Sequence, residues 1–366
     1  MTDIITIDEQ RFHAHWLRDS CQCEHWVHKE SGERLGDVAQ LADWPKINTY
    51  RVTDDALIID WDELGHTQCT FRRDWLHLHA YDNAPEKDSG IEPVEWDLSI
   101  LPAEAKEPVD ASCPFSEWMQ HLWRFGFVRL KGLNPDHLGT FINSIGPIHP
   151  IGPDDTLIWD IKVNIAGNDL SYGSEGVALT PHTDQVTGDA DFLQFLACRE
   201  NSVAGGQGMV VDGLRLVREL ARNHPEHLET LLTQPVSYQA RFTDYKADYL
   251  RSRPIIELDA KGKFCSIRFN PHRRAPLKVE YSQTVAMLEA LSTLTRLAYD
   301  PANRFCFAYQ PGDCLIVDNR RVLHGREAFN SASGSRHLHV AYCLTELVEG
   351  RWQYLTGESP VRAGVL

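Results

Sequence analysis

Three residues that stand far apart in the sequence could together hold a metal ion. His182 and Asp184 form an H-x-D pair, and His324 follows much later in the chain. In an extended segment, side chains at positions i and i+2 lie on the same face, so the pair offers an imidazole and a carboxylate on one side. Two imidazoles and one carboxylate on one face of a six-coordinate iron leave three positions open, and this is the ligand set of non-heme Fe(II) oxygenases. The three residues therefore predict a catalytic Fe(II) site with room for a co-substrate and O2.

Two arginines close to His324 could bind that co-substrate. Arg336 opens an alternating, strand-like run over 336–342, and Arg326 follows His324 closely. The planar fork of a guanidinium can grip a carboxylate while the other end of the same small molecule chelates the metal. A 2-oxo diacid would be held in this way. We therefore expect Arg336 to bind the co-substrate, with Arg326 as the next candidate.

Strands and turns must position these side chains. A turn at 310–313 precedes a buried strand ending near 319, which we expect to deliver His324 at its end, with Arg336 on the next strand of a hairpin. Periodicity and stop signals predict further strands at 127–130, 157–163 and 191–197, and helices at 115–125, 214–222 and 285–297. Because strands dominate, the expected fold class is mainly β, and a double-stranded β-helix (jelly-roll) core with flanking helices fits better than an alternating parallel sheet. Periodicity alone does not separate these two folds.

Composition suggests three parts along the chain. Residues 1–82 read as a small N-terminal α+β module, and residues 111–366 as the domain that carries the metal site. Residues 83–110 are rich in Pro, Glu, Asp and Ala and lack a long apolar period, so they are predicted to be a linker.

Charge and cysteine usage narrow the classes of partner and the compartment. The formal net charge is -16, and the sequence contains no run of Lys or Arg that would form a basic patch. Both observations argue against nucleic acid and anionic membrane surfaces as partners. No stretch approaches a membrane span, and the first residues lack a signal-peptide pattern, so a cytoplasmic protein is expected. The chain has nine cysteines, an odd number without small-scaffold spacing. Reduced thiols or a metal are expected rather than a disulfide framework.

Several segments resemble a known family. They are His182 through Gln194, Gly205-Gly206, 211–213, 311–313, Asp318-Asn319 and 323–326. They are similar to the Fe(II)/2-oxoglutarate dioxygenases related to taurine dioxygenase, and most of all to the gamma-butyrobetaine hydroxylase and trimethyllysine hydroxylase branch. The resemblance implies a hydroxylase that uses Fe(II), 2-oxoglutarate and O2, with 2-oxoglutarate as the diacid at Arg336. It also implies a homodimer.

The resemblance extends to the N-terminal module, where relatives bind structural zinc. In them a Trp-Leu-Arg-Asp segment, here 16–19, precedes three closely spaced Cys and a later His. This chain has Trp26 in place of the third Cys. A zinc site would then need Cys21, Cys23, His66 and a fourth ligand, for which the candidates are His28, His25 and Cys69. The alternative is that zinc has been lost and an aromatic core holds the module, formed by Trp16, Trp26, Trp61 and Trp75.

The branch also implies a substrate with a trimethylammonium head inside a cage of aromatic rings. Matching positions for the cage are Trp159, Tyr172 and Tyr342. Asn168 and Asn270 fall near positions that contact the substrate acid, and Gln185 and Arg268 are further polar candidates. Since these extra polar groups suit a phosphonate, the preferred substrate is 2-trimethylaminoethylphosphonate, hydroxylated to its 1-hydroxy product. The alternative is gamma-butyrobetaine, giving L-carnitine; trimethyllysine is disfavoured because nothing accommodates its second ammonium group.

Two other classes remain open from the residues. A zinc hydrolase could use His182, Asp184 and His324, but it would not need Arg336 and would require a general base near a metal-bound water. A cupin-like binding protein could keep the fold without turnover. Only a dioxygenase consumes O2 and 2-oxoglutarate and releases succinate and carbon dioxide.

Overall fold

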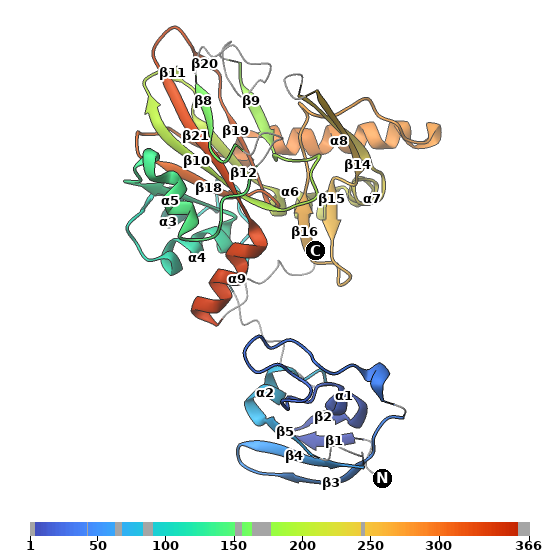
Figure 1. The fold of residues 1–366 in the computed structure, drawn as a ribbon. Helices are drawn as coiled ribbons and strands as arrows, with labels where there is room; N and C mark the ends of the chain where they lie inside the picture. Colours follow the sequence, from blue (N-terminus) through green and yellow to red (C-terminus); the bar gives the residue numbers. More distant parts are fainter. Residues whose placement is uncertain are drawn as a thin grey trace. The chain divides into compact units, whose positions relative to one another are not determined.

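The structure is a computed structural model that describes residues 4–41, 43–62, 68–82, 91–150, 156–162, 177–242 and 246–357. The chain divides into two compact units, residues 1–87 and 88–366 (Figure 1). Within the described ranges, no helix combines the length and the apolar character that a membrane span requires.

The first unit is a small α+β structure. A hairpin of β1 (Ile4–Ile7) and β2 (Gln10–His13) leads into α1 (Ala14–Asp19), and η1 (Val38–Gln40) precedes an antiparallel sheet. That sheet has the order β3 (Ile47–Val52), β4 (Ala56–Trp61), β5 (Gln68–Arg72), and α2 (Arg73–Leu78) follows it. Alternate residues of β4 are buried, which is the pattern of a strand with one face on a core. Trp26 and Trp61 are buried in that core, and Trp16 and Trp75 pack against it.

The second unit contains two main sheets. The larger has the order β6 (Val109–Asp110), β7 (Phe127–Lys131), β18 (Cys314–Asp318), β10 (Phe192–Asn201), β21 (Arg336–Leu344), β8 (Trp159–Lys162). The smaller has the order β17 (Arg304–Phe307), β12 (Gly208–Asp212), β19 (Val322–Arg326), β9 (Leu179–His182). All neighbours are antiparallel except β6 and β7. Three further strand pairs lie outside these sheets: β11 (Ala204–Gly205) with β20 (Phe329–Asn330), β13 (Val236–Phe242) with β14 (Ala247–Arg253), and β15 (Ile256–Leu258) with β16 (Phe264–Ile267).

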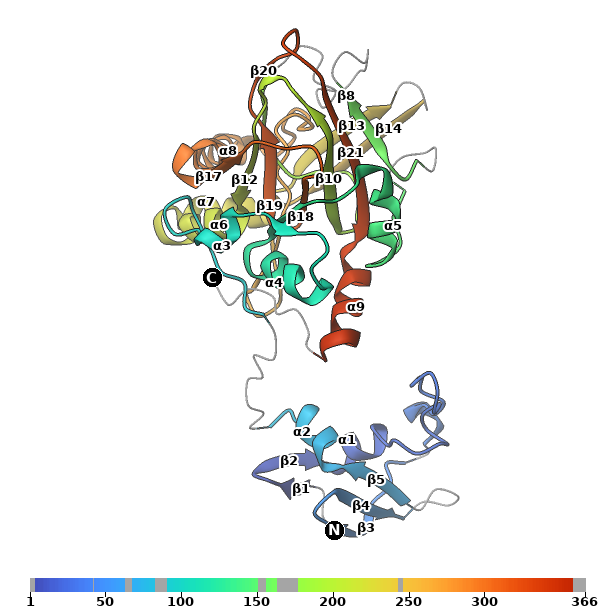
Figure 2. The same ribbon diagram turned by 90° about the vertical axis from the view of Figure 1, so that its left-hand side faces the viewer.

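Helices cover the outer faces of both sheets (Figures 1 and 2). The larger sheet packs against α4 (Phe115–Phe125), α5 (Leu138–Asn143) and α9 (Thr345–Thr356), which share a buried cluster with Leu193, Phe195 and Ile316. The smaller packs through Val211 and Leu323 against α6 (Gly213–Asn223), α7 (Pro225–Thr233) and α8 (Thr284–Tyr299). The remaining helices are short: α3 (Ala103–Lys106), η2 (Pro135–His137), η4 (Tyr281–Gln283) and η5 (Pro301–Asn303).

The inner faces of the two sheets meet in a third apolar cluster. Phe192, Leu196 and Val340 reach it from the larger sheet, and Val210 and Phe305 from the smaller. A strand buried on one face by helices and on the other by a second sheet is apolar at nearly every position, as β18 and the buried first seven residues of β10 are. The second unit is therefore mainly β with flanking helices, as the sequence predicted.

Residues 91–110, expected to belong to a linker, instead pack into the second unit. Trp96 is fully buried, its backbone N–H donates to Asp212 (3.0 Å) and its indole N–H donates to the carbonyl of Phe125 (2.7 Å). Leu101 and Ala105 join the same inner cluster. The segment is polar overall, but its few apolar residues are enough to attach it to the core. Residues 83–90 lie outside the described part of the chain.

Two details of strand order also differ from expectation. The strand 314–318 does not deliver His324, because the chain turns at Asn319 and His324 lies within the following strand, β19. Arg336 does not lie on the next strand of a hairpin with β19, because β21 belongs to the larger sheet and β19 to the smaller. The two residues therefore approach each other across the space between the sheets.

Candidate active site

The three metal-ligating candidates converge in one cavity. His182 ends β9 and pairs in register with His324 on β19, while Asp184 lies just beyond β9. The Nε2 atom of His182 is 3.4 Å from Oδ1 of Asp184, and the Nε2 atom of His324 is 3.7 Å from Oδ2. One possible ligand atom from each residue lies within 4.8 Å of the others. All three side chains line a cavity of about 580 Å³ between the two sheets.

A ring of hydrogen bonds holds Asp184 in place. Its backbone N–H donates to Oδ1 of Asn319 (2.8 Å), and Nδ2 of Asn319 donates to its carbonyl (2.9 Å). Its carboxylate accepts from Nε2 of Gln194 (2.7 Å) and from the hydroxyl of Tyr342 (2.9 Å). Burial alone would raise the pKa of Asp184, but hydrogen bonding to His182 and the nearby His324 hold that pKa below its ordinary value. The carboxylate is thus ionised and fixed in direction.

Both histidines present Nε2 toward Asp184. The Nδ1 atom of His182 lies 2.8 Å from the carbonyl of Thr180 and donates its proton there, so in the metal-binding form of the ring Nε2 would offer a lone pair in place of its hydrogen bond to Asp184. Burial, followed by the neighbouring His182, lowers the pKa of His324 to about 4. Neutral imidazole is the form that binds a metal, and both rings are buried and close, with centroids 4.5 Å apart.

Two buried guanidinium groups lie in the same cavity. Arg336 is 5% exposed, and within the described ranges it makes no hydrogen bond or ion pair. Arg326 donates to the carbonyl of Val177 (2.5 Å) and lies over the ring of Phe329. Burial lowers the pKa of both arginines, and the charge of Arg336 contributes to lowering that of Arg326 to about 10. Like charges buried together are costly unless an anion joins them, so this end of the cavity requires a carboxylate or a similar group.

The donor set fits Fe(II), and the arginines fit a diacid co-substrate. Two imidazoles and one carboxylate are the donor set of a non-heme Fe(II) centre, and here their possible ligand atoms lie close together in the wall of the cavity. His182, Asp184 and His324 could therefore hold the iron, while Arg336 could hold the far carboxylate of 2-oxoglutarate.

The predicted substrate residues are distributed unevenly. Trp159, Gln185, Asn270 and Tyr342 line the cavity. Gln185 adopts a left-handed backbone conformation with φ 55°, which turns the chain immediately after Asp184. Asn168 and Tyr172 lie outside the described residues.

Two of these residues, Asn270 and Tyr342, also make hydrogen bonds within the protein. The side-chain amide of Asn270 donates to the carbonyl of Thr183 (3.0 Å) and accepts from the backbone N–H groups of His272 and Arg273 (both 3.1 Å). The hydroxyl of Tyr342 is bonded to Asp184, so this residue orients a ligand candidate in addition to offering a ring to the cavity.

Arg268 does not lie in the cavity. Its guanidinium pairs with Asp191 (2.9 Å) and lies 3.9 Å from Glu257. The prediction that Arg268 contacts the substrate acid is therefore not supported, because two carboxylates outside the cavity already attract its charge. Arg273 lines the cavity instead, although no pattern in the sequence distinguishes it from its neighbours.

Sequence reasoning gave no role to Gln194 and Asn319, although both bind Asp184. A signal existed for Gln194, since it is the single polar residue in the run 192–197 and a buried polar side chain usually has a specific partner. Asn319 offered no such signal, because a polar residue after a strand is ordinary turn chemistry.

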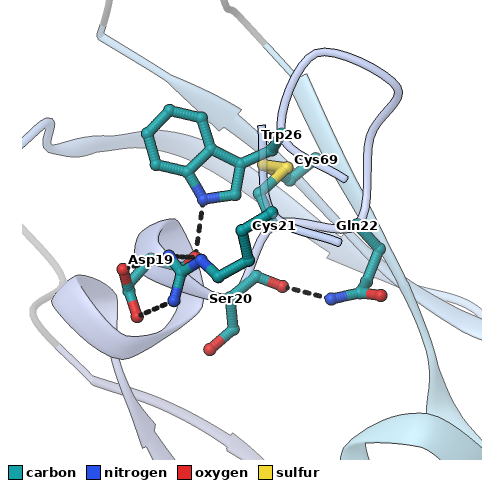
Figure 3. Close-up of a disulfide and its surroundings, with 7 residues drawn as sticks. Asp19, Ser20, Cys21, Gln22, Trp26 and Cys69 are labelled. Atoms are coloured by element: carbon teal, nitrogen blue, oxygen red, sulfur yellow. Dashed lines mark hydrogen bonds and ion pairs between the residues drawn. A yellow bond between two sulfur atoms is a disulfide. The ribbon is translucent and has the colours of Figure 1, made fainter. Parts of the chain in front are cut away.

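The predicted zinc site of the first unit is altered by a disulfide. Cys21 and Cys69 are joined (Figure 3), which corrects the expectation of reduced thiols for this pair. While they are joined, their sulfurs are not available as zinc thiolates. Trp26, at the position of the third cysteine, donates from its indole to the carbonyl of Asp19 (2.7 Å), and the guanidinium of Arg18 lies over its ring. His28 is hydrogen-bonded to Ser31, and His66 lies outside the described residues.

The chain is similar in sequence to known dioxygenases. Residues 102–342 match the family described as taurine catabolism dioxygenase TauD, TfdA family. The chain is 29% identical to a gamma-butyrobetaine dioxygenase of Pseudomonas sp. (strain AK-1), over 90% of this chain and 87% of that protein. It is 26% identical to a trimethyllysine dioxygenase of Meyerozyma guilliermondii, over 96% and 92% of the two chains. Among solved structures, PvcB from Pseudomonas aeruginosa has a TM-score of 0.48 and 18% identity, over 64% of this chain and 81% of that chain.

Proposed function

The chain belongs to the taurine catabolism dioxygenase TauD, TfdA family, and from this premise we propose that it hydroxylates an aliphatic carbon of a small trimethylammonium acid. It is an Fe(II)- and 2-oxoglutarate-dependent dioxygenase. The observation that carries the proposal is the convergence, in one cavity, of His182, Asp184 and His324 beside the buried Arg336, which has no ion-pair partner among the described residues. We assign the two facing sheets that enclose this cavity to the double-stranded β-helix.

Each group at the centre has a defined task. His182, Asp184 and His324 bind Fe(II), which with 2-oxoglutarate and O2 supplies the chemistry that turns a C–H bond into a hydroxyl group, with release of succinate and carbon dioxide. Arg336 binds the distal carboxylate of 2-oxoglutarate through both arms of its fork. Gln194 and Tyr342 keep the Asp184 carboxylate in one orientation, since both donate to its Oδ2 atom.

Aromatic side chains give the cavity its affinity for a quaternary ammonium group. Trp159, Phe192 and Tyr342 line it, together with Tyr249 and Tyr309. Ring faces attract a cation that has no hydrogen to donate, so a trimethylammonium head is held without a hydrogen bond. Support also comes from relatives named for gamma-butyrobetaine and trimethyllysine, two trimethylammonium compounds.

Gamma-butyrobetaine is the first candidate for the substrate. The sequence favours a phosphonate because of Gln185 and Arg268, but Arg268 is paired with Asp191 outside the cavity. A carboxylate needs fewer donors than a phosphonate, and Arg273 and Gln185 remain at the cavity wall. The expected product is L-carnitine, with 2-trimethylaminoethylphosphonate as the competing substrate to be tested beside it.

A substrate panel tests the proposal. The protein loaded with Fe(II) is mixed with 2-oxoglutarate and, separately, gamma-butyrobetaine, 2-trimethylaminoethylphosphonate, trimethyllysine and taurine. Succinate release and the gain of one oxygen in the substrate are measured by mass spectrometry. We expect coupled turnover with a trimethylammonium acid and little with taurine, which has a primary amine. Preferred turnover of taurine would overturn the substrate class, and absence of any substrate-dependent succinate would favour a binding protein.

A further inference from the structure

A second group of two histidines and one aspartate lies on the opposite side of the sheet from the catalytic cavity. Asp160 is on the edge strand β8, and His337 and His339 are on β21, where His339 pairs in register with Asp160. One possible ligand atom from each lies within 4.8 Å of the others. From this geometry we propose that Asp160, His337 and His339 form a binding site for a divalent transition metal ion, with Zn²⁺ as the expected occupant.

Strand alternation separates this cluster from the catalytic site. On β21, Arg336, Leu338 and Val340 line the cavity, so His337 and His339 between them face the other way. On β8, Trp159 and Ile161 line the cavity, so Asp160 also faces outward. The cluster therefore shares no ligand with His182, Asp184 and His324.

The hydrogen bond on the far side of His339 directs its other ring nitrogen at a carboxylate oxygen. Nδ1 of His339 lies 3.1 Å from the carbonyl of Pro135, which can only accept, so Nδ1 carries a proton. In the neutral ring, Nε2 then points a lone pair at Oδ1 of Asp160, 3.2 Å away. Two acceptors at that distance repel unless a proton or a metal ion lies between them. Nε2 of His337 contacts the same Oδ1 atom, which gives a metal ion a third donor.

The surroundings fit a site with one open position. The side chains of His337 and His339 are 13% and 12% exposed, whereas Asp160 is 50% exposed. Imidazole and carboxylate are suitable zinc ligands, and three protein ligands leave a position for water. The ammonium group of Lys162 is 3.7 Å from Asp160 Oδ1 and competes with a metal ion for that carboxylate. Among the described strands β8 pairs only with β21, so an ion here would tie this edge strand, which carries Trp159, to the rest of the sheet.

The test uses the full chain, stripped with a chelator and then titrated with Zn²⁺. Bound zinc is measured by elemental analysis after gel filtration, and diethyl pyrocarbonate labelling with mass spectrometry reports His337 and His339 individually. We expect zinc to protect both histidines from labelling. His339→Gln should remove one zinc equivalent relative to wild type, and Asp160→Asn, which keeps the shape, should weaken binding at least about tenfold.

Two further variants sharpen the outcome. Lys162→Gln should tighten zinc binding, because it removes the competing charge. His224→Gln is the matched control, since His224, Glu226 and His227 form another possible ligand group within the described chain. That change should leave the protection of His337 and His339 intact. Unprotected histidines, or equal zinc content in wild type and His339→Gln, would overturn the site in favour of a proton-bridged strand contact.

Discussion

Two regions of the second unit bury an arginine to almost the same extent and treat it in opposite ways. Arg321 is 6% exposed and Arg336 is 5% exposed. Arg321 donates twice to Asp212 (2.8 and 2.9 Å), and also to the carbonyls of Arg124 (2.9 Å) and Val94 (2.6 Å). Within the described chain, Arg336 makes no hydrogen bond and no ion pair. A buried charge with all its partners supplied by the protein holds the fold together, whereas one without them is reserved for a ligand.

The largest expected effect is on turnover at the site beside Arg336. Asp184→Ala removes the only carboxylate of the proposed iron site, so substrate-dependent succinate release should fall below detection. The overall fold should persist, because the side chain faces a cavity rather than a packed core. Circular dichroism serves as the control for folding. Full activity in this variant would refute the iron assignment.

In the Arg321 region the expected effect is on stability rather than on turnover. Arg321→Ala leaves Asp212 buried without its charge partner, and the free energy of unfolding should fall by about 3–5 kcal/mol. In the described part of the chain the charge of Arg336 has no ion-pair partner, so Arg336→Ala should leave the free energy of unfolding unchanged or raise it. Urea denaturation of both variants, without co-substrate, measures the difference. Equal destabilisation would remove the contrast between the two arginines.

Co-substrate binding provides the reverse comparison. Arg336→Ala should weaken 2-oxoglutarate binding by about 1.5–3 kcal/mol, roughly 10- to 150-fold, the range for a hydrogen bond to a charged group. Arg336→Lys keeps the charge but not the fork and should fall between Ala and wild type. The 2-oxoglutarate KM reports both. If neither variant changes it, the role passes to Arg326, the other buried guanidinium in the cavity.

A smaller effect is expected for the aromatic wall. Trp159→Leu should weaken binding of the trimethylammonium substrate by about 0.5–2 kcal/mol, as a cation–π contact is lost. The 2-oxoglutarate KM should hardly change. Tyr342→Phe is the useful comparison, because it keeps the ring but removes the hydroxyl that donates to Asp184. It should preserve substrate affinity and reduce turnover, so a loss of affinity equal to that of Trp159→Leu would contradict this division of roles.

The smallest difference is expected at Arg268. Because its charge is paired with Asp191 outside the cavity, Arg268→Ala should lower stability without changing the preference between the carboxylate and phosphonate betaines. Competition between the two substrates, in wild type and variant, measures that preference. A selective loss of the phosphonate would restore Arg268 to the substrate pocket.

Residue types and their spacing were sufficient to predict the chemistry of the site and the class of the fold. His182, Asp184, His324 and Arg336 could be chosen because iron and carboxylate recognition demand particular residue types, and these types stood in strand-like or turn-like segments. The mainly β class followed from the predominance of strand-like segments, such as 157–163 and 191–197, over helical ones.

Which side chains meet became clear only from the three-dimensional structure. His324 and Arg336 were expected on one hairpin, but they come from different sheets, since strand pairing depends on contacts between distant segments that local periodicity does not encode. The same limit explains Arg268, whose sequence context resembled a pocket residue until Asp191 was found beside its charge. Tertiary contacts also explain the disulfide between Cys21 and Cys69 and the burial of Trp96, which was expected in a linker. They also place His337 and His339 on the face of the sheet opposite the cavity. Side-chain type limits what a residue can bind, but the three-dimensional arrangement of the chain decides whether its partner is a ligand, a metal ion or another part of the protein.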